Sequence, residues 1–530
     1  MSRIIITGSL HPKAFELLDQ ESDISYDYMP DLEREKLLEA IPEYHCIISR
    51  SETTIDKDLI DKGKSLKMIS RAAVGVGNID IDYATSKGIV VINTPGINTN
   101  SAAELTLGLM LGCCRKIYSA HSSILDHKWT RHQFTGSELR GKTIGIVGLG
   151  NVGSRVARFL HAFDCKLLAY DPYVTTKYCE DYFCQQVNLD ELLSHSDIIT
   201  FHTPLNSKTK GMINEKEFDK MKQGVFIINA ARGGIVNEQA LYTNMCAGKV
   251  AAAGIDTWEV EPLGDTPLRG HPNVLMTPHI GASTDEAQLG IAESVIKETV
   301  AGIRGGIVNN PLNLPNIKLL RNNTIIKYSV LAEKLGKITS QYLENDFMPT
   351  NMEFLYRGSL NQQDCGLIML YFIYGYLRDN LDVPVSYVNA LDLAKQKGIS
   401  IKENEDKDFS DYESAIRVRI FSKEKSFVIG GTLLGKDKIR LTYFQDLKYE
   451  IEPVGHMLFV ENRDTPGMVG HMGVTMQEFD LNINQFYLSR YAPGTSALTV
   501  ILLDSQPTQA VIDKLLKHEN ILSVKSINLN

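Results

Sequence analysis

Short apolar runs alternate with stretches of helical periodicity along the first part of the chain. In residues 1–95 the runs 4–7, 46–49, 68–72 and 89–93 have the length and β-branched content of buried strands, and helical spacing fills the intervals between them. Such alternation is typical of a parallel sheet with crossover helices. A long helix is expected next, from Ser101 to Ser119.

The alternation restarts more strongly at Gly141. Six strands are predicted there, with helical stretches between them, at 143–147, 166–170, 198–202, 225–229, 250–256 and 274–277. This pattern indicates a complete doubly wound sheet that ends near Ser283. A helix from Glu286 to Arg304 follows, and the Gly-, Pro- and Asn-rich segment 305–316 is expected to be a linker.

Beyond this linker the pattern changes. Residues 316–452 mix helical and β-rich stretches, and the last segment has the order strand, helix, strand, strand, helix, strand of a ferredoxin-like domain. The predicted fold class is α/β, with two doubly wound, Rossmann-like parallel-sheet domains and a cleft, an α+β intervening domain and a C-terminal ferredoxin-like domain. The expected domains are 1–95 together with 286–310, then 96–285, 316–452 and 454–530.

Composition and charge narrow the classes of function. The chain of 530 residues is 43% hydrophobic with a net charge of −9, so neither nucleic acid nor an anionic membrane is an expected partner. The eight cysteines show no regular spacing, which favours reduced thiols over disulfides or a metal site. The first residues are already a predicted strand and no apolar stretch is long enough to span a bilayer, so we expect a cytoplasmic protein.

A glycine-rich motif follows the predicted strand 143–147. Gly148 permits a tight turn, Gly150 lets the backbone approach a pyrophosphate, and Gly153 allows the next helix to pack closely. The N-terminus of that helix offers free N–H groups to phosphates. The following strand leads to Asp171, which can accept hydrogen bonds from ribose hydroxyls and repels a 2′-phosphate, so NAD is expected rather than NADP.

Polar side chains follow the last three strands of the second sheet, where ligands of such sheets bind. The imidazole of His279 can take a hydroxyl proton, Glu261 can orient that imidazole and favour its charged form, and Arg232 can clamp a carboxylate. Asp256 is placed to accept a hydrogen bond from the nicotinamide carboxamide. His202 is a rival base at a strand end, but it lies on the adenosine side and has no evident acidic partner.

The stretches NAARGGIVNEQAL, GIDTWEVEP and TPHIGAST resemble motifs of the D-2-hydroxyacid dehydrogenase family. By that resemblance Arg232 binds the carboxylate of an anionic 2-hydroxyacid, and His279, paired with Glu261, is the catalytic acid/base. The family has two doubly wound domains linked by two crossing helices. The resemblance also implies cofactor contacts by Asn151, Val152, Thr203, Ala230, Gly281 and Ala282.

Within the family the resemblance extends along essentially the whole chain to long-form enzymes that oxidise D-3-phosphoglycerate, the first step of serine synthesis. It rests on ISRAAVGVGNIDI, INTPGINTNSAAELT and VNALDLAKQKGI. The glycine turn at 75–77 can present N–H groups to a carboxylate. Arg50, Arg71 and Arg131 are similar to the family's phosphate-binding arginines, and the resemblance implies that Arg131 reaches in from a neighbouring subunit. The substrate-binding residues implied are Arg50, Arg71, Gly75, Val76, Gly77, Asn98, Arg131 and Arg232.

The terminal segment resembles an ACT regulatory domain, and the resemblance implies L-serine as effector and a homotetramer as the assembly. The effector residues would be Asp464, Gly467, Asn482 and Ile483. An assembly module without a ligand is the alternative for this segment. For the whole chain, the alternatives are another D-2-hydroxyacid dehydrogenase, acting on glycerate, hydroxypyruvate or 2-hydroxyglutarate, and a non-catalytic NAD-sensing interaction protein.

Overall fold

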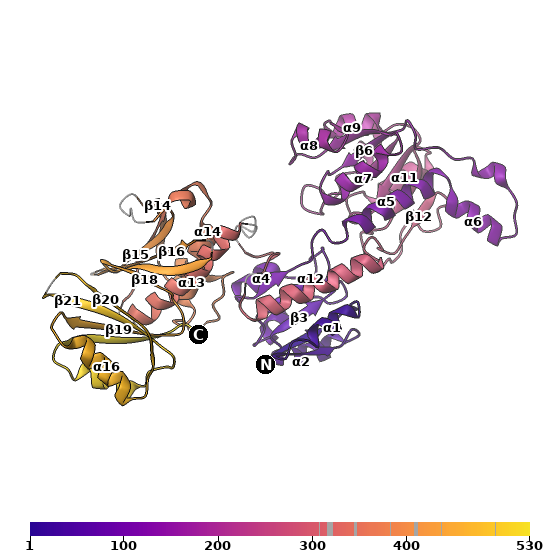
Figure 1. Ribbon diagram of the computed structural model, residues 1–530. Helices are drawn as coiled ribbons and strands as arrows, with labels where there is room; N and C mark the ends of the chain where they lie inside the picture. The colour runs from indigo at the N-terminus through magenta and orange to yellow at the C-terminus, as the bar shows by residue number, and fades with distance from the viewer. Residues whose placement is uncertain are drawn as a thin grey trace. The chain divides into compact units, whose positions relative to one another are not determined.

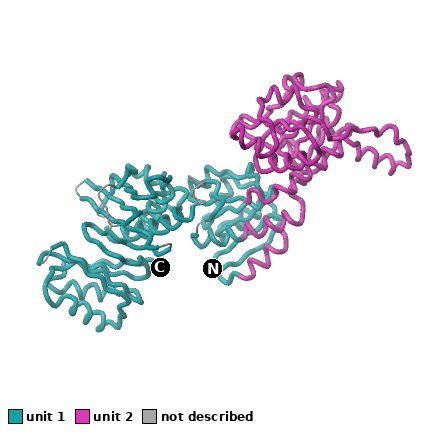
Figure 2. The backbone as a smooth tube through the Cα atoms, turned by 45° about the horizontal axis from the view of Figure 1, so that its top comes forward, with its two compact units in different colours: residues 1–9, 21–93, 297–530 teal, residues 10–20, 94–296 magenta. Residues whose placement is uncertain are grey.

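The computed structural model describes residues 1–306, 308–314, 322–343, 347–381, 383–406, 412–423, 425–435, 437–492 and 494–530. The chain divides into two compact units, one of residues 1–9, 21–93 and 297–530 and the other of residues 10–20 and 94–296 (Figure 2). The linker expected at 305–316 lies partly outside the described residues.

The unit of residues 94–296 is built on a seven-stranded parallel sheet in the order β12-β11-β10-β9-β6-β7-β8 (Figure 1). All six predicted strands are present. The seventh, β8, is missing from the sequence prediction because its three residues, CQQ, carry no apolar run. The strands are β6 (Thr143–Val147), β7 (Lys166–Tyr170), β8 (Cys184–Gln186), β9 (Ile198–Phe201), β10 (Val225–Asn229), β11 (Val250–Ile255) and β12 (Val274–Met276).

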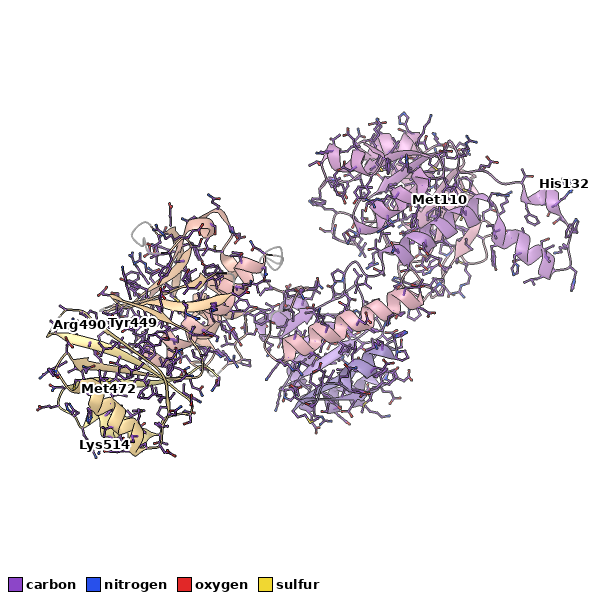
Figure 3. The ribbon with its side chains drawn as sticks, viewed as in Figure 1. Met110, His132, Tyr449, Met472, Arg490 and Lys514 are labelled. Carbon is purple, nitrogen blue, oxygen red and sulfur yellow. The ribbon has the colours of Figure 1, made fainter. Side chains whose placement is uncertain are left out.

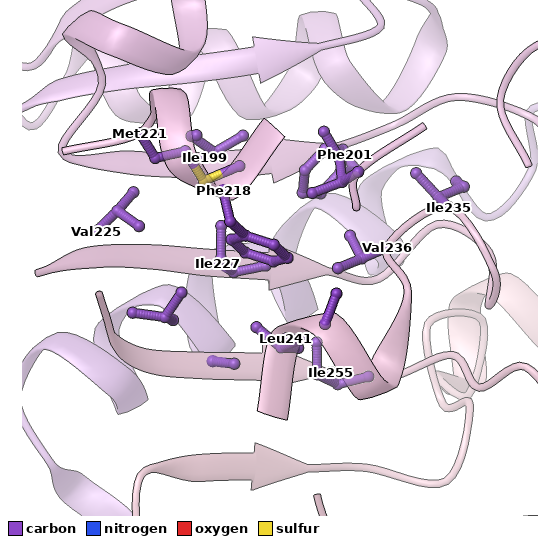
Figure 4. Packing of buried hydrophobic residues seen from close by; sticks show 14 of the residues in the cluster. Ile199, Phe201, Phe218, Met221, Val225, Ile227, Ile235, Val236, Leu241 and Ile255 are labelled. Atoms are coloured by element: carbon purple, nitrogen blue, oxygen red, sulfur yellow. The ribbon is translucent and has the colours of Figure 1, made fainter. Parts of the chain in front are cut away.

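Helices cover both faces of this sheet, so the doubly wound prediction is confirmed. On one face, strand residues such as Phe201 and Ile227 pack against α9, α10 and α11 (Figure 4). On the other face, Ile146 and Ile228 pack against α5 and α7. These helices, with α8, are α5 (Thr99–Cys114), α7 (Asn151–His161), α8 (Thr176–Asp181), α9 (Leu189–His195), α10 (Glu215–Lys220) and α11 (Glu238–Cys246).

The prediction of a single helix from Ser101 to Ser119 is wrong. The chain forms two helices, because Lys116 between them has a φ of 51°, a left-handed conformation that hydrophobic periodicity does not reveal. The second helix, α6 (Ile117–Leu125), and the turn η2 (Arg131–Phe134) form an arm that projects from the body of this unit, with His132 near its tip (Figures 1 and 3). The arm exposes five large apolar side chains: Ile117, Tyr118, Ile124, Leu125 and Trp129.

The N-terminal part of the other unit is a five-stranded parallel sheet in the order β2-β1-β3-β4-β5. Its edge strand β2, ISYDY, is not among the predicted strands because it has only one fully buried side chain. The strands are β1 (Ser2–Ile6), β2 (Ile24–Tyr28), β3 (Cys46–Ser49), β4 (Met68–Arg71) and β5 (Val90–Ile92). The helices in this part of the sequence are α1 (Lys13–Leu18), α2 (Arg34–Ala40), η1 (Ile41–Glu43), α3 (Lys57–Lys62) and α4 (Ile81–Ser86), and α12 (Asp285–Ile303) runs from one unit into the other.

Two more sheets follow α12. The first is mixed and six-stranded, in the order β14-β13-β15-β16-β17-β18. The same part of the chain contains three helices: α13 (Asn323–Leu343), α14 (Gly366–Leu377) and α15 (Ala390–Gln396). Its strands, with a short turn η4 (Gly358–Gln362), are β13 (Asn351–Arg357), β14 (Ser400–Glu405), β15 (Ala415–Phe421), β16 (Ser426–Leu434), β17 (Lys438–Phe444) and β18 (Leu447–Ile451).

The last sheet is antiparallel, in the order β20-β21-β19-β22, and Met472 and Leu515 of its two helices join its core, so the predicted βαββαβ order is confirmed (Figure 3). Its elements are β19 (His456–Arg463), α16 (Met468–Glu478), β20 (Ile483–Arg490), β21 (Ser496–Leu503), α17 (Gln509–Leu516) and β22 (Ile521–Asn528). Across the described part of the chain, every helix is too short or too polar to cross a bilayer.

Candidate active site

Three loops leave neighbouring strands at one side of the seven-stranded sheet. Arg232 follows β10, Glu261 follows β11 and His279 follows β12, and these strands are adjacent in the sheet. Because parallel strands end at the same edge, residues separated by up to 47 positions in the sequence come together. The loops are called the arginine, acid and histidine loops below.

The central contact joins the histidine loop to the acid loop. Nδ1 of His279 lies 2.7 Å from Oε2 of Glu261, whose Oε1 accepts a hydrogen bond from the N–H of Trp258 at 3.0 Å. Burial raises the pKa of Glu261, but the hydrogen bonds from His279 and Trp258 and the nearby positive charges outweigh burial, so the pKa is lowered. An ionised carboxylate only accepts, so Nδ1 carries a proton, and Nε2 of the 42% exposed imidazole is left for a substrate.

The guanidinium of Arg232 is half-buried beside this pair. Its desolvation lowers the pKa of Arg232, and the charge of Glu261 opposes the shift. The next residue, Gly233, is where the arginine loop meets the acid loop: a Cβ there would lie 1.8 Å from the carbonyl oxygen of Trp258. Only glycine allows this approach, so the position of the arginine is fixed relative to the acid.

The buried side chain of Asp256, which is 0% exposed, supports the histidine loop through hydrogen bonds. Its Oδ1 accepts from the hydroxyl of Thr277 at 2.6 Å and the N–H of Ile280 at 2.8 Å, and its Oδ2 accepts from the N–H of Gly281 at 3.0 Å. His279, whose φ is 55°, donates its N–H to the carbonyl of Asp256 at 2.8 Å. This carboxylate is expected from the sequence to face the nicotinamide carboxamide, whereas in the structure both of its oxygens accept hydrogen bonds from the histidine loop.

Other residues that join the loops are not predicted from the sequence. The indole N–H of Trp258 donates to the carbonyl of Thr277 at 3.0 Å, which ties the acid loop to the histidine loop. Glu238 and Glu259 each accept a hydrogen bond from the other's backbone N–H, at 2.8 and 3.3 Å, which ties the start of α11 to the acid loop. Trp258 is one of only two tryptophans in the chain, and that rarity within the acid motif was the available signal.

His202, the rival base, has different surroundings. It follows β9, its Nε2 lies 3.0 Å from the hydroxyl of Thr200, and desolvation lowers the pKa of His202 to about 3. A histidine that stays neutral at every physiological pH lacks the titration needed for acid/base exchange. The geometry therefore favours His279 for proton transfer.

The glycine loop before α7 fits a dinucleotide. Gly148 has a φ of 91°, and a Cβ on Gly153 would lie 2.0 Å from the carbonyl oxygen of Gly148, so both positions require glycine. A Cβ on Gly150 would meet nothing within 4 Å, which leaves open space beside the N-terminus of α7 where a pyrophosphate is bound in this fold. Asn151 and Val152 form the first turn of that helix.

The remaining cofactor candidates surround the same edge of the sheet. The carboxylate of Asp171 accepts from the N–H groups of Leu149 and Tyr173, each at 2.9 Å, so it lies against the glycine loop. The hydroxyl of Thr203 is buried without a hydrogen-bond partner among the described residues, as expected of a group that meets a ligand. Ala230 follows β10 directly, and Gly281 and Ala282 follow His279.

The candidate substrate residues belong to both units. Asn98 precedes α5, and Arg131 is exposed on the η2 turn of the arm. Arg50 and Arg71 follow β3 and end β4, and the turn Gly75, Val76 and Gly77 lies beside Arg71, whose Nε donates to the carbonyl of Gly75 at 2.8 Å.

The candidate effector residues of the terminal domain are largely engaged with the protein. Asp464 accepts from Arg490 at 3.3 Å and from the N–H of Gly494 at 3.2 Å, while the carboxamide of Asn482 donates to Asp504 at 2.6 Å. Gly467, with a φ of 93°, precedes α16, and Ile483 begins β20 opposite Leu503.

Comparison with known proteins places this site in a family. Residues 107–281 match the model of the D-isomer specific 2-hydroxyacid dehydrogenase, NAD binding domain, and residues 324–445 match the D-3-phosphoglycerate dehydrogenase intervening domain. D-3-phosphoglycerate dehydrogenase of Archaeoglobus fulgidus is 36% identical over 99% of this chain and 100% of its own length, and that of Bacillus subtilis is 34% identical over 100% of both.

Solved structures of related enzymes match about three-fifths of the chain. A glyoxylate reductase from Paecilomyes thermophila is 32% identical with a TM-score of 0.54, covering 59% of this chain and 98% of that one. D-lactate dehydrogenase from Aquifex aeolicus, complexed with NAD and lactic acid, is 28% identical with a TM-score of 0.52, covering 59% and 99%.

Together the doubly wound sheet, the glycine loop and the arginine, acid and histidine loops define an NAD-dependent 2-hydroxyacid dehydrogenase. Its cofactor is NAD. The chain belongs, over its full length, to the D-3-phosphoglycerate dehydrogenase family.

The buried carboxylate of Asp256 yields a first prediction. Three groups donate hydrogen bonds to this carboxylate, and in Asp256→Asn one of them loses its acceptor. This loss lowers the free energy of unfolding by about 1–3 kcal/mol. We expect lower stability in thermal unfolding and at least tenfold faster hydrogen–deuterium exchange at the amides of Ile280 and Gly281. Asp265→Asn, an exposed acid of the same region, is the control. Unchanged exchange in Asp256→Asn would remove this residue from the support of the histidine loop.

Proposed function

We propose that this chain oxidises the C2 hydroxyl of D-3-phosphoglycerate to the ketone of 3-phosphohydroxypyruvate, with His279, Glu261 and Arg232 as the catalytic residues. The observation that carries the proposal is the 2.7 Å contact between His279 Nδ1 and Glu261 Oε2, beside a desolvated arginine. The full-length relatives named for this activity support the choice of substrate.

The chemistry follows from these groups. Bound NAD supplies the acceptor for the hydride that leaves C2. Nε2 of His279 takes the hydroxyl proton as the C=O bond forms, and the positive charge that appears on the imidazole is balanced by Glu261. Arg232 holds the substrate carboxylate with two parallel hydrogen bonds, which fixes C2 and its hydroxyl relative to the imidazole.

Arg71 supports recognition of a substrate that carries a second anionic group. The residue is 4% exposed, and its Nη1 is buried without a hydrogen-bond partner among the described residues. Desolvation lowers the pKa of Arg71 to about 10. The charge of Glu52 opposes this shift, and the smaller effect of the charge of Arg50 adds to it. Two guanidinium groups that repel each other are stabilised by a shared anion, and a phosphate has the charge for that role.

Regulation and assembly are further parts of the proposal. L-serine binds the terminal domain at Asp464, Gly467, Asn482 and Ile483 and lowers turnover, as the ACT-like order of its elements suggests.

The substrate domain is residues 1–95 with 286–310, the NAD domain is 96–285, and 316–452 and 454–530 are the intervening and regulatory domains of a cytoplasmic homotetramer. The apolar arm of α6 and η2 is a surface that another subunit would cover, and Arg131 would reach the partner's site from it.

The activity is tested by NADH production from a panel of 2-hydroxyacids, with and without L-serine. D-3-phosphoglycerate is expected to give the highest kcat/KM. His279→Ala should lower kcat by at least a thousandfold, within the range of about 10²–10⁴ for loss of a general base, while NADH still binds. His195→Ala, an exposed histidine at the end of α9, serves as the control. A near-normal rate in His279→Ala would refute the assignment, and no NADH from any hydroxyacid would favour an NAD-sensing protein.

The pair also predicts a pH effect. Because the pKa of Glu261 is lowered, its carboxylate stays ionised and stabilises the imidazolium, and the folding stability this adds is lost only as the pH falls through that lowered pKa. In Glu261→Gln the imidazole loses that support. We expect kcat for oxidation to fall about ten- to a hundredfold, and the loss of folding stability that follows protonation of Glu261 to disappear from the pH dependence of unfolding. Glu286→Gln, an exposed acid of α12, should leave both measurements unchanged.

Phosphate recognition is tested by comparing D-3-phosphoglycerate with D-glycerate. Loss of one charge-assisted contact, worth about 1.5–3 kcal/mol, should raise KM for the phosphorylated substrate about ten- to a hundredfold in Arg71→Ala and in Arg50→Ala. KM for D-glycerate should change little. Arg34→Ala, a surface arginine paired with Asp56, is the control. Equal losses on both substrates would exclude these arginines from phosphate binding.

A further inference from the structure

A cavity of about 370 Å³ opens beside α7, the helix that follows the glycine loop. The start of α5, one side of α7, Tyr178 of α8 and Tyr182 after that helix line it, and all of them belong to the unit of residues 94–296. α5 packs against α7, and a Cβ on Gly96 would lie 3.6 Å from the carboxamide nitrogen of Asn151 across the entrance. The lining residues are Gly96, Ile97, Thr99, Asn100, Asn151, Ser154, Arg155, Arg158, Tyr178 and Tyr182.

Most side chains of the lining are hydrogen-bond donors or carry a positive charge. Asn151, Ser154, Arg155 and Arg158 occupy positions i, i+3, i+4 and i+7 of α7, so they share one side of the helix. None of the lining residues is acidic, and neither arginine forms an ion pair with a carboxylate in the described part of the chain. Two positively charged side chains without a counter-ion in one cavity favour the binding of an anion over that of a neutral or positively charged ligand.

Neighbouring groups fix this arrangement. The guanidinium of Arg158 lies over the ring of Tyr182, with Cζ 4.9 Å from the ring centroid, and the ring of Tyr178 is tilted against that of Tyr182 at 4.9 Å. The N-termini of α5 and α7 both border the cavity, and the backbone partial charges at such ends favour an anion.

The cavity extends beyond the position of the cofactor pyrophosphate. A pyrophosphate on the glycine loop sits at the N-terminus of α7, whereas Arg158 lies seven residues further along, about 10 Å at 1.5 Å per residue. We propose that this cavity is a second anion site, distinct from the substrate site and adjoining the dinucleotide site, which binds a small phosphate-bearing metabolite through Arg155 and Arg158. Asn151 lies both in the first turn after the glycine loop and in this wall, so the bound anion is placed to weaken cofactor binding by like-charge repulsion.

The test is a calorimetric titration of the full chain with glycerol 2-phosphate at constant ionic strength. Four proteins are compared: the natural sequence, Arg155→Ala/Arg158→Ala, Arg50→Ala, and Arg140→Ala as a control at an exposed arginine of the same unit. Arg50→Ala weakens any binding at the substrate phosphate site, so the two sites are measured separately. A parallel NADH titration reports whether each variant retains its fold.

The double variant should lose at least tenfold in affinity for glycerol 2-phosphate at one site that Arg50→Ala and Arg140→Ala both retain. In the natural sequence, glycerol 2-phosphate should also raise the Kd for NADH two- to tenfold relative to chloride. If the double variant fails to bind NADH, the exposed Arg158→Ala alone is used, with the same loss expected. An unchanged isotherm in these variants, or binding that disappears only in Arg50→Ala, would overturn the proposal while leaving the dehydrogenase assignment intact.

Discussion

The side chain of Asp256 sets the geometry on which the catalytic residues depend. It has no exposed surface, and it accepts hydrogen bonds from the hydroxyl of Thr277 and from the N–H groups of Ile280 and Gly281. Between these donors His279 has a left-handed backbone, which costs a residue with a Cβ about 1–3 kcal/mol. A buried carboxylate with well-placed donors offsets that cost, so the imidazole is presented in one orientation.

The other two loops are positioned by close packing and backbone hydrogen bonds. Gly233 brings the arginine loop against the carbonyl of Trp258, and Glu238 and Glu259 exchange hydrogen bonds with each other's backbone. None of these contacts uses the groups assigned to chemistry. Nη1 of Arg232 donates to the carbonyl of Ala231 at 2.6 Å, and the other guanidinium N–H groups and Nε2 of the histidine are left for a substrate.

The sequence predicts what depends on apolar runs and fixed spacing. The strands TIGIV and VFIIN and the glycine loop appear as expected, because a parallel sheet buried on both faces requires such runs. The edge strand β8 and the break at Lys116 escape prediction, because polar edge residues and a single left-handed residue leave no periodic signal. The partners of Asp256 and the buried Nη1 of Arg71 were equally hidden, since both depend on contacts between distant segments.

The two strand-end histidines show why spacing alone cannot identify a base. His202 and His279 each lie beyond the carboxyl end of a strand of the same sheet. The first follows the central strand β9, where burial lowers its pKa to about 3 and its neighbour is a hydroxyl. The second follows the edge strand β12, where solvent reaches it and the acid loop supplies a carboxylate. The position of a strand within its sheet therefore decides which histidine can exchange a proton.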